Sequence, residues 1–228
     1  MKITINRDKE LVECKLPFKS TTLLKALYHI KSYLDPTLTF SSNCRSGVCG
    51  ECAVRVNGKE VLACSHKIES SDIVEPLKYH KLQRDLKVDK TKAIDKLKIS
   101  TSWLHQPKEI IITPKDVKIT EKQSECILCS SCYSVCPVLE INPNFIGAFA
   151  LSRAYRYTSD PRETQIKTII DNVQTNGIWD CTLCGECTAV CPQGIDPKMD
   201  ITMLRSQSTQ FGYSDPNFMA MDFGFGGF

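Results

Sequence analysis

Apolar residues alternate with polar ones in the first part of the chain, which is the pattern of half-buried strands. The alternation occurs at Ile3 and Ile5, and again at Val12, Cys14 and Leu16. A polar stretch between the two runs predicts a turn. We therefore expect two neighbouring strands. Cys14 shares a strand face with Val12 and Leu16, so we expect it to be a small buried core residue.

A helical pattern and a hairpin signal follow. Thr21 or Thr22 can cap a helix, whose apolar face would consist of Leu23, Leu24, Leu27 and Ile30. Further on, Asn57-Gly58 separates two short apolar runs, which is a strong signal for a two-residue hairpin turn. We expect residues 1–76 to form a small mixed sheet with one helix laid across it.

Residues 77–120 are basic and polar, and they predict a linker between two domains. Four apolar residues recur there at roughly helical spacing, namely Leu82, Leu86, Ile94 and Leu97. Part of the linker is therefore expected to be an amphipathic helix. Its lysines predict a solvated face. The alternative is a docking surface for a larger partner.

Residues 121–209 have helical patterning. Asp160-Pro161-Arg162-Glu163 offers an N-cap, a proline at the first helical position and a capping-box acid in order. Asn176-Gly177 is expected to end that helix. Asp196-Pro197 predicts the start of another helix in the same way.

The tail, residues 210–228, is rich in phenylalanine, methionine and glycine. It holds five of the nine phenylalanines, Phe211, Phe218, Phe223, Phe225 and Phe228, together with Met219 and Met221. One interpretation is a flexible end. The other is an apolar strip that packs on a partner, because exposed aromatic residues mark contact sites.

Composition and charge argue against a protein that binds nucleic acid or an acidic membrane surface. Hydrophobic residues make up 42% and charged residues 24% of the 228 positions, and the net charge of +3 is too small to favour nucleic acid or an acidic membrane surface. No run of about 18 apolar residues occurs, so no transmembrane helix is expected. The N-terminus resembles a strand rather than a signal peptide. We expect the chain to stay in the cytosol unless a partner with an export signal carries it across a membrane.

The cysteines carry the chemistry. Thirteen cysteines in a chain without a secretion signal point away from disulfides and toward metal binding. The first group is Cys44-x4-Cys49-x2-Cys52, followed by Cys64, which is plant-type [2Fe–2S] spacing. A zinc site is the alternative, but zinc sites commonly use two Cys-x2-Cys pairs.

The loop between these cysteines has to wrap a cluster. Gly47 and Gly50 let it turn tightly and bring backbone N–H groups to the sulfurs. Arg45 and Ser46 are candidates for tuning the cluster, together with the backbone around Gly47.

Two further groups have bacterial cubane spacing. They are Cys126-x2-Cys129-x2-Cys132-x3-Cys136-Pro137 and Cys181-x2-Cys184-x2-Cys187-x3-Cys191-Pro192. In paired motifs the fourth cysteine of each run binds the other run's cluster. One [4Fe–4S] cluster is thus expected on Cys126, Cys129, Cys132 and Cys191, and a second on Cys136, Cys181, Cys184 and Cys187. The long segment between the runs favours a helical ferredoxin domain.

No residues predict substrate chemistry on this chain. It lacks a phosphate-binding glycine motif and a nucleophile–base set, and its four histidines are scattered at His29, His66, His80 and His105. We therefore expect no catalytic residue. The expected work is to fix the distance between clusters and to set their potentials.

These motifs resemble the iron–sulfur subunit of succinate dehydrogenases and fumarate reductases. The segments that carry the resemblance are SNCRSGVCGECA (42–53), LAC (62–64), ECILCSSC (125–132), NPNFIG (142–147) and RAYR (153–156). The resemblance extends from Met1 to about Arg205. It implies an α+β chain, in which a β-grasp plant-type ferredoxin domain precedes an all-α helical ferredoxin domain.

The resemblance also implies a role in electron transfer. The clusters would link a flavoprotein subunit, where FAD interconverts succinate and fumarate, to a membrane-side subunit that handles quinone. The [2Fe–2S] cluster would face the flavin. The chain would lie at the cytoplasmic face of the inner membrane, attached through its partners, or on the periplasmic side if it is exported with one.

Two departures from the family pattern sharpen this expectation. Most members lack a cysteine at the position of Cys184 and hold [3Fe–4S] as their third cluster, so a full set of ligands predicts [4Fe–4S] here, with [3Fe–4S] as the alternative. Ile141 and Thr182 replace a tryptophan and a histidine that help to form the quinone pocket. This favours the branch with a cysteine-rich third subunit that resembles a heterodisulfide reductase subunit. The alternatives are a subunit of a soluble thiol-linked fumarate reductase or related anaerobic enzyme, and a zinc-stabilised interaction protein.

Overall fold

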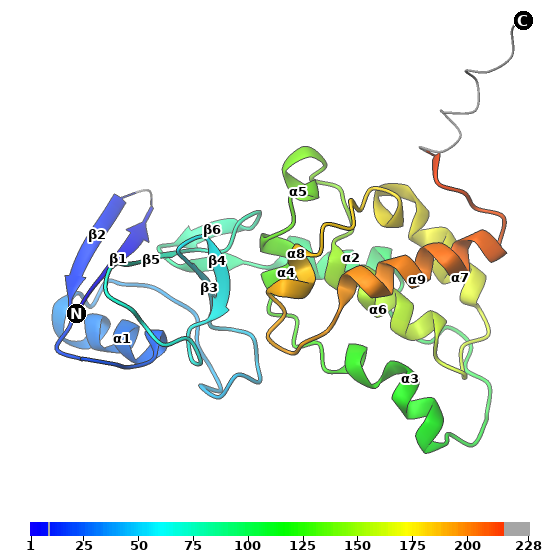
Figure 1. Cartoon of the computed structure of the whole chain (residues 1–228), viewed down its shortest axis with the longest axis horizontal. Helices are drawn as coiled ribbons and strands as arrows, with labels where there is room; N and C mark the ends of the chain where they lie inside the picture. The colour runs from blue at the N-terminus through cyan, green and yellow to red at the C-terminus, as the bar shows by residue number, and fades with distance from the viewer. Residues whose placement is uncertain (9, 217–228) are drawn as a thin grey trace, which may run out of the picture.

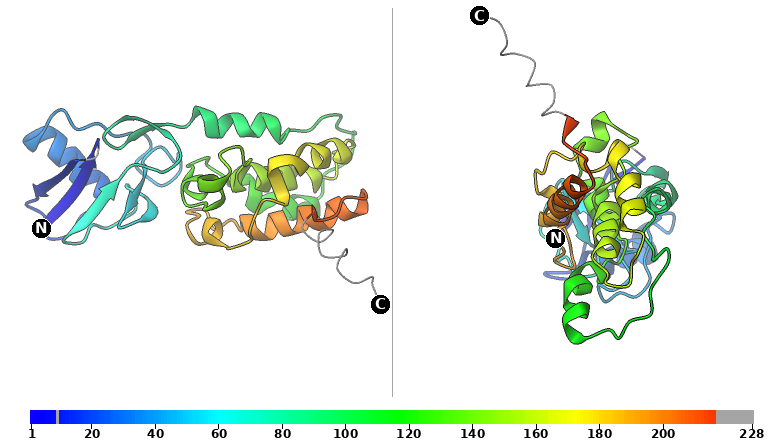
Figure 2. Two further views of the ribbon diagram at one scale, coloured as in Figure 1. Left: turned by 90° about the horizontal axis from the view of Figure 1, so that it is seen from above. Right: turned by 90° about the vertical axis from the view of Figure 1, so that its right-hand side faces the viewer.

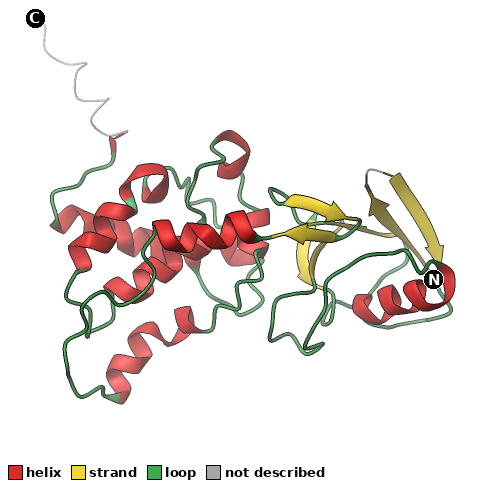
Figure 3. Cartoon of the chain, turned by 180° about the vertical axis from the view of Figure 1, so that it is seen from behind, coloured by secondary structure: helices red, strands yellow, loops and turns green. Residues whose placement is uncertain are grey.

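The computed structural model describes residues 1–8 and 10–216. A unit of strands and a unit of helices lie end to end along the longest axis of the molecule (Figure 1), and the colouring by secondary structure separates them clearly (Figure 3). The expected α+β class is confirmed.

The N-terminal unit is a five-stranded mixed sheet in the order β2-β1-β5-β3-β4. The strands are β1 (Lys2–Arg7), β2 (Glu10–Lys15), β3 (Ala53–Val56), β4 (Lys59–Leu62) and β5 (Asp72–Glu75). Only β1 and β5 pair in parallel. The predicted hairpin is confirmed, because β3 and β4 pair across Asn57-Gly58. Cys14 is buried as expected, but Val12, on the same edge strand β2, is 36% exposed.

Helix α1 (Leu23–His29) packs on this sheet and continues into a π-helical turn, η1 (Ile30–Leu34). The predicted cap is confirmed at Thr22, whose hydroxyl accepts a hydrogen bond from the Lys25 N–H at 3.4 Å. The predicted apolar face of this helix is buried in the same core as Ile3 and Ile5. This core extends to Cys129 of the first cubane motif.

The linker differs from the prediction in its first half. A hairpin, β6 (Lys81–Arg84) and β7 (Lys87–Asp89), precedes helix α2 (Thr91–Ile99), so the expected helical spacing holds only for Ile94 and Leu97. Asp85 adopts a positive φ of 49° at the turn. Its carboxylate accepts hydrogen bonds from Arg7 Nε at 2.9 Å and from the Thr39 N–H at 2.7 Å. These long-range contacts fix a turn that local periodicity does not reveal.

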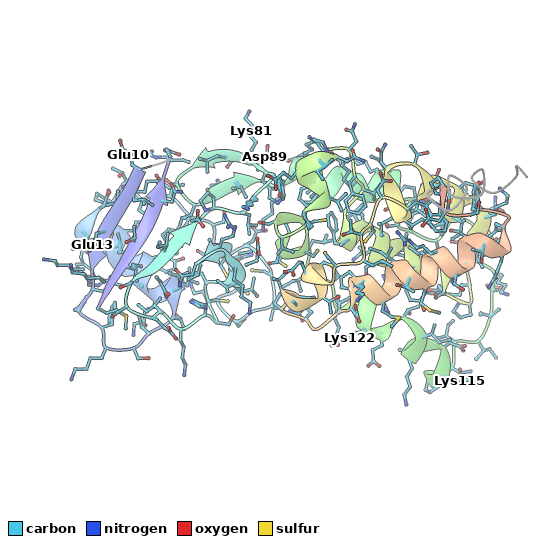
Figure 4. All side chains as sticks on the ribbon, turned by 45° about the horizontal axis from the view of Figure 1, so that its top comes forward. Glu10, Glu13, Lys81, Asp89, Lys115 and Lys122 are labelled. Atoms are coloured by element: carbon cyan, nitrogen blue, oxygen red, sulfur yellow. The ribbon has the colours of Figure 1, made fainter. Side chains whose placement is uncertain are left out.

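Two helices follow the path of the linker. Helix α2 lies along the helical unit (Figure 2) and packs on α6 (Ala148–Thr158). Helix α3 (Pro114–Ser124) begins with a capping box between Thr113 and Asp116 and buries no residue. Lys115 points away from the body of the molecule (Figure 4). Lys96 of α2, in contrast, is 6% exposed and donates to the Asn144 carbonyl at 2.9 Å, so the predicted solvated face does not include every lysine of the linker.

The remaining helices surround a second core. They are α4 (Ser131–Ser134), α5 (Val138–Ile141), α7 (Ile166–Asn172), the π-helical turn η2 (Gln174–Ile178), α8 (Glu186–Ala189) and α9 (Pro197–Gln210). Helix α6 packs against both α7 and α9. Phe145, Leu151 and Ile201 are fully buried there. This core also contains cysteines from both cubane motifs.

The helix predicted at Pro161 begins only at Ile166. Asp160 does not cap it, because its carboxylate binds the Arg162 guanidinium and the Arg162 N–H. Glu163 is 4% exposed and accepts a hydrogen bond from the His105 N–H at 2.9 Å. The predicted start at Asp196-Pro197 is confirmed, since the Asp196 side chain accepts from the Met199 N–H.

The predicted tail is only partly described. Phe211 is 38% exposed just beyond α9. The other phenylalanines of the tail and its methionines, from Phe218 onward, lie outside the described residues. No helix in the described part of the chain is both long enough and apolar enough to cross a membrane.

Candidate metal centres

The first site is the loop that carries Cys44, Cys49 and Cys52, closed by Cys64. The Cys44 sulfur accepts hydrogen bonds from the backbone N–H groups of Ser46, Val48 and Cys49 at 3.4, 3.4 and 3.3 Å. The Ser46 N–H, and after it the Cys49 thiol and the Val48 N–H, lower the pKa of the Cys44 thiol to about 6. A loop that turns its N–H groups toward sulfur favours the thiolate, which is the form that binds iron.

Cys52 and Cys64 close the first site from the β3–β4 hairpin. The Ala63 N–H donates to the Cys52 carbonyl at 3.0 Å, which sets the two cysteines side by side. Burial is the main cause that raises the pKa of Cys52 to about 11. The four cysteines predicted for the first site are thus brought together by one loop and one hairpin.

The four further residues predicted to tune or shape this site act in different ways. Arg45 places its guanidinium 5.0 Å from the centre of the Tyr28 ring. Ser46 contributes its N–H to the Cys44 sulfur, while its hydroxyl donates to the Cys44 carbonyl at 3.4 Å. Gly47 and Gly50 have positive φ angles of 78° and 72°. Both glycines therefore supply backbone shapes that other residues rarely adopt.

The middle site is a cavity lined by Cys126, Cys129, Cys132 and Cys191. Its other lining residues are mostly apolar, among them Ile127, Leu128, Phe149, Pro192 and Ile195. Burial holds the pKa of the Cys132 thiol well above its usual value. Cys191 comes from the second cubane motif, so the structure brings together the interchanged set that the spacing predicts.

The last site is a cavity lined by Cys136, Cys181, Cys184 and Cys187. Val138, Phe145 and Ala148 form part of its wall. Burial raises the pKa of Cys187 to about 12. Cys184 is the exposed member of the set, and Thr182 lies in the same wall. Ile141, the other departure from the family pattern, is 89% exposed on α5.

The two cubane motifs share a backbone shape. Leu128 and Leu183 have φ angles of 52° and 54°, and each lies two residues after the first cysteine of its motif. Ser130 and Gly185 also match, at 70° and 89°. The Leu183 N–H donates to the Cys181 sulfur at 3.4 Å. The internal repeat in the sequence is therefore a repeat in three dimensions.

The residues present fit iron–sulfur clusters. Each cubane cavity gathers four thiols in walls that are otherwise largely apolar. Buried thiols with raised pKa values stay protonated in the absence of metal. Bound iron cations would stabilise the buried thiolates, so the thiols would lose their protons as the metal binds. When bound, the clusters supply one-electron redox chemistry.

Two residues near the first site carry no signal in the sequence. Lys90 donates to the Gly50 carbonyl at 3.1 Å, and Gln193 donates to the Gly47 carbonyl at 3.3 Å. They lie 40 and 146 positions from their partners along the chain. Only the fold brings them to the loop.

Two family models match separate parts of the chain. Residues 4–95 match the family model of a 2Fe-2S iron-sulfur cluster binding domain, and residues 122–195 match that of a 4Fe-4S dicluster domain. In a solved structure of the Mycobacterium smegmatis Sdh1 complex in the apo form, one chain aligns with a TM-score of 0.81. The alignment covers 94% of this chain and 98% of that chain at 21% identity, so it supports the fold alone.

Curated relatives are similar over most of this chain. The fumarate reductase iron-sulfur subunit of Haemophilus influenzae is 32% identical, over 90% of this chain and 89% of the relative. The 8-methylmenaquinol:fumarate reductase iron-sulfur subunit of Wolinella succinogenes is 33% identical, over 91% and 70%. A subunit of the fumarate reductase (CoM/CoB) of Methanothermobacter marburgensis is also 33% identical, over 83% of this chain but only 39% of that longer protein. The chain therefore belongs to the fumarate reductase and succinate dehydrogenase family of iron–sulfur subunits.

Proposed function

We propose that this chain relays single electrons within a fumarate reductase or succinate dehydrogenase complex. The observation that carries the proposal is the sequence of three four-cysteine sites along the molecule. The first site meets the middle site where Gly50 packs on Cys129. The middle site neighbours the last, because Cys187 of the last site is close enough for its charge to raise the pKa of the Cys132 thiol.

The ligand sets follow from the cavities. Cys44, Cys49, Cys52 and Cys64 would hold [2Fe–2S], and the middle and last sites would each hold [4Fe–4S]. The presence of Cys184 in the wall of the last site supports a cubane there over [3Fe–4S]. Arg45, Ser46, Gly47 and Gly50 would tune or shape the first site.

The partners would be a flavoprotein subunit with FAD and a third subunit on the membrane side. Substrate chemistry would belong to the flavoprotein, while this chain would hold the clusters and exclude water. We place it at the cytoplasmic face of the inner membrane, attached through its partners, with the periplasmic side as the alternative for a complex that is exported.

The third subunit distinguishes two versions of the function. Quinone would be reached through that subunit, because Ile141 and Thr182 replace the residues that the family uses for its quinone pocket. The similarity to a fumarate reductase (CoM/CoB) protein favours, as a second candidate, a soluble thiol-linked enzyme.

Activity of the purified complex tests these candidates. A quinol analogue should support fumarate reduction if the third subunit is quinone-linked, and thiols alone should not. Fumarate reduction by thiols in the absence of quinol would favour the second candidate. Zinc without iron in the purified chain would contradict both.

A further inference from the structure

We propose that Lys90 and Gln193 are positioning residues that clamp the first site's loop against the middle site and so set the electron step between the two units. This inference rests on the proposed function. The clamp consists of two hydrogen bonds, from Lys90 Nζ to the Gly50 carbonyl and from Gln193 Nε2 to the Gly47 carbonyl.

The loop needs such donors because of how it wraps its cluster. Its N–H groups at Ser46, Val48 and Cys49 turn inward to the Cys44 sulfur. The carbonyls of Gly47 and Gly50 accept from other segments instead. Gly50 is buried, so its carbonyl requires a partner, whereas Gly47 is half-buried in an otherwise exposed part of the loop. Lys90 and Gln193 supply these partners from outside the loop.

The two donors come from different parts of the molecule. Lys90 lies between β7 and α2, whereas Gln193 follows Cys191-Pro192, so it is two residues from a cysteine of the middle site. The Gln193 bond therefore runs directly from the middle site's own segment to the first site's loop. Two donors from separate segments therefore hold the loop at two points, Gly47 and Gly50.

The clamped contact is unusually close. A Cβ atom added at Gly50 would lie 2.8 Å from the Cα and Cβ atoms of Cys129 and 2.9 Å from the Ile127 carbonyl. The backbone of the first site's loop thus touches a cysteine of the middle site. A small displacement of the loop away from Cys129 would lengthen the path that an electron takes between the two sites.

Other contacts hold the two units together independently of this clamp. The Ser134 hydroxyl donates to Glu60 Oε1 at 2.8 Å and accepts from the Lys78 N–H at 2.8 Å. Loss of the clamp should therefore loosen the loop while leaving the units docked. Lys90 also places a positive charge beside the first site, which favours the more negative, reduced state of a cluster there.

The test compares variants in the purified complex. Lys90→Met and Gln193→Met keep side-chain length and remove the donor, and Lys90→Arg keeps donor and charge. Lys87→Met and Gln83→Met are matched controls, because both residues are exposed on the β6–β7 hairpin. Iron and acid-labile sulfide are measured in every variant, and pulsed paramagnetic resonance gives the magnetic coupling between the first and middle clusters.

We expect weaker and more heterogeneous coupling in the Lys90→Met, Gln193→Met double variant, with electron transfer several-fold slower between these two centres. Lys90→Met alone should move the midpoint potential of the first centre to a more negative value, whereas Lys90→Arg and both controls should behave as the wild type. If the double variant does not assemble, the single variants carry the same comparison. Wild-type coupling and potential in the single and double variants would overturn the inference. A wild-type complex that passes no electrons through this chain would instead overturn the proposed function.

Discussion

At the scale of single residues, the surroundings of a cysteine decide whether the pKa of its thiol is lowered or raised. Backbone N–H donors lower the pKa of Cys44 to about 6, while burial raises that of Cys187 to about 12. Two residue types explain this contrast: loop residues that present N–H groups to sulfur, and apolar residues that exclude water. The thirteenth cysteine, Cys14, is buried in the sheet core and lines neither cubane cavity.

Cys184 decides the type of the last cluster. Replacing Cys184 with serine removes one thiolate from the last site, so we expect one iron to be lost and a [3Fe–4S] centre to remain. Paramagnetic resonance of the oxidised protein should then show a strong [3Fe–4S] signal that the wild type lacks. Cys14→Ala is the control and should leave the spectrum unchanged. A strong [3Fe–4S] signal in the wild type at full iron content would contradict the assignment.

Asp200 is a buried carboxyl beside the middle site. It accepts hydrogen bonds from the hydroxyl of Ser152, a residue of that cavity's wall, and from Gln123 Nε2 at 2.8 Å. Burial raises its pKa from 3.8 to about 6. The folded pKa of Asp200 lies above the unfolded value, so the protonated carboxyl favours the folded state. Its contribution to the free energy of unfolding is complete below about pH 4 and is lost as the pH rises through about 6.

Asp200→Asn should remove this pH dependence. At pH 8 we expect the variant to be more stable than the wild type by about 1–3 kcal/mol, the equivalent of a pKa shift of about two units with some allowance for relaxation. The thermal midpoint, followed by visible absorbance between pH 5 and 8, checks this. The exposed Asp95→Asn serves as the control. A wild-type midpoint that does not fall relative to Asp200→Asn over this range would contradict the prediction.

At the scale of elements, the cysteine-bearing turns are the parts that the sequence predicted best. Short spacings fix them locally, and the strong caps at Thr22 and Asp196 likewise define the starts of α1 and α9. The start of α7 and the β6–β7 hairpin could not be predicted, because they depend on distant partners. Glu163 is held by the His105 backbone, and Leu86 is buried in the core of the sheet unit. The Lys90 and Gln193 contacts escaped prediction for the same reason.

Gly50 and Gly47 offer a paired test of the joint between the two units. Alanine at either position suffers the strain of a positive φ, about 1–2 kcal/mol. Only at Gly50 does the added Cβ also collide with Cys129, because at Gly47 no atom lies within 4 Å. Gly50→Ala should therefore lose more iron and have a lower thermal midpoint than Gly47→Ala. Equal losses would show that backbone shape alone explains both glycines.

At the scale of the whole molecule, the two units depend on metal to different degrees. The sheet unit has a continuous apolar core around Ile3, Ile5 and Leu27, which also buries Cys52 and Cys129, but neither cubane cavity is lined by its strands. The core of the helical unit incorporates cysteines of both cubane motifs, whose thiols line two cavities. The helical unit should therefore lose its packing when iron is removed, while the sheet unit keeps more of its own.

Limited proteolysis after chelation tests this difference. We expect early cleavage in residues 121–209 and a more resistant N-terminal fragment, identified by intact mass. The untreated protein is the control and should resist cleavage in both units. First cleavage within the sheet unit would show that the first site, rather than the cubane sites, is the one on which the fold depends.

The interchange of the fourth cysteines has a consequence for biosynthesis. Under the proposed assignment, the first site has all its ligands once Cys64 has left the ribosome. The middle site cannot be completed until Cys191 emerges, when most of the chain has been made. The last site has to wait for Cys187 even though it takes Cys136 from the earlier motif. Cluster insertion can thus begin on the nascent sheet unit, whereas the helical unit has to remain open to the assembly machinery until translation is nearly finished.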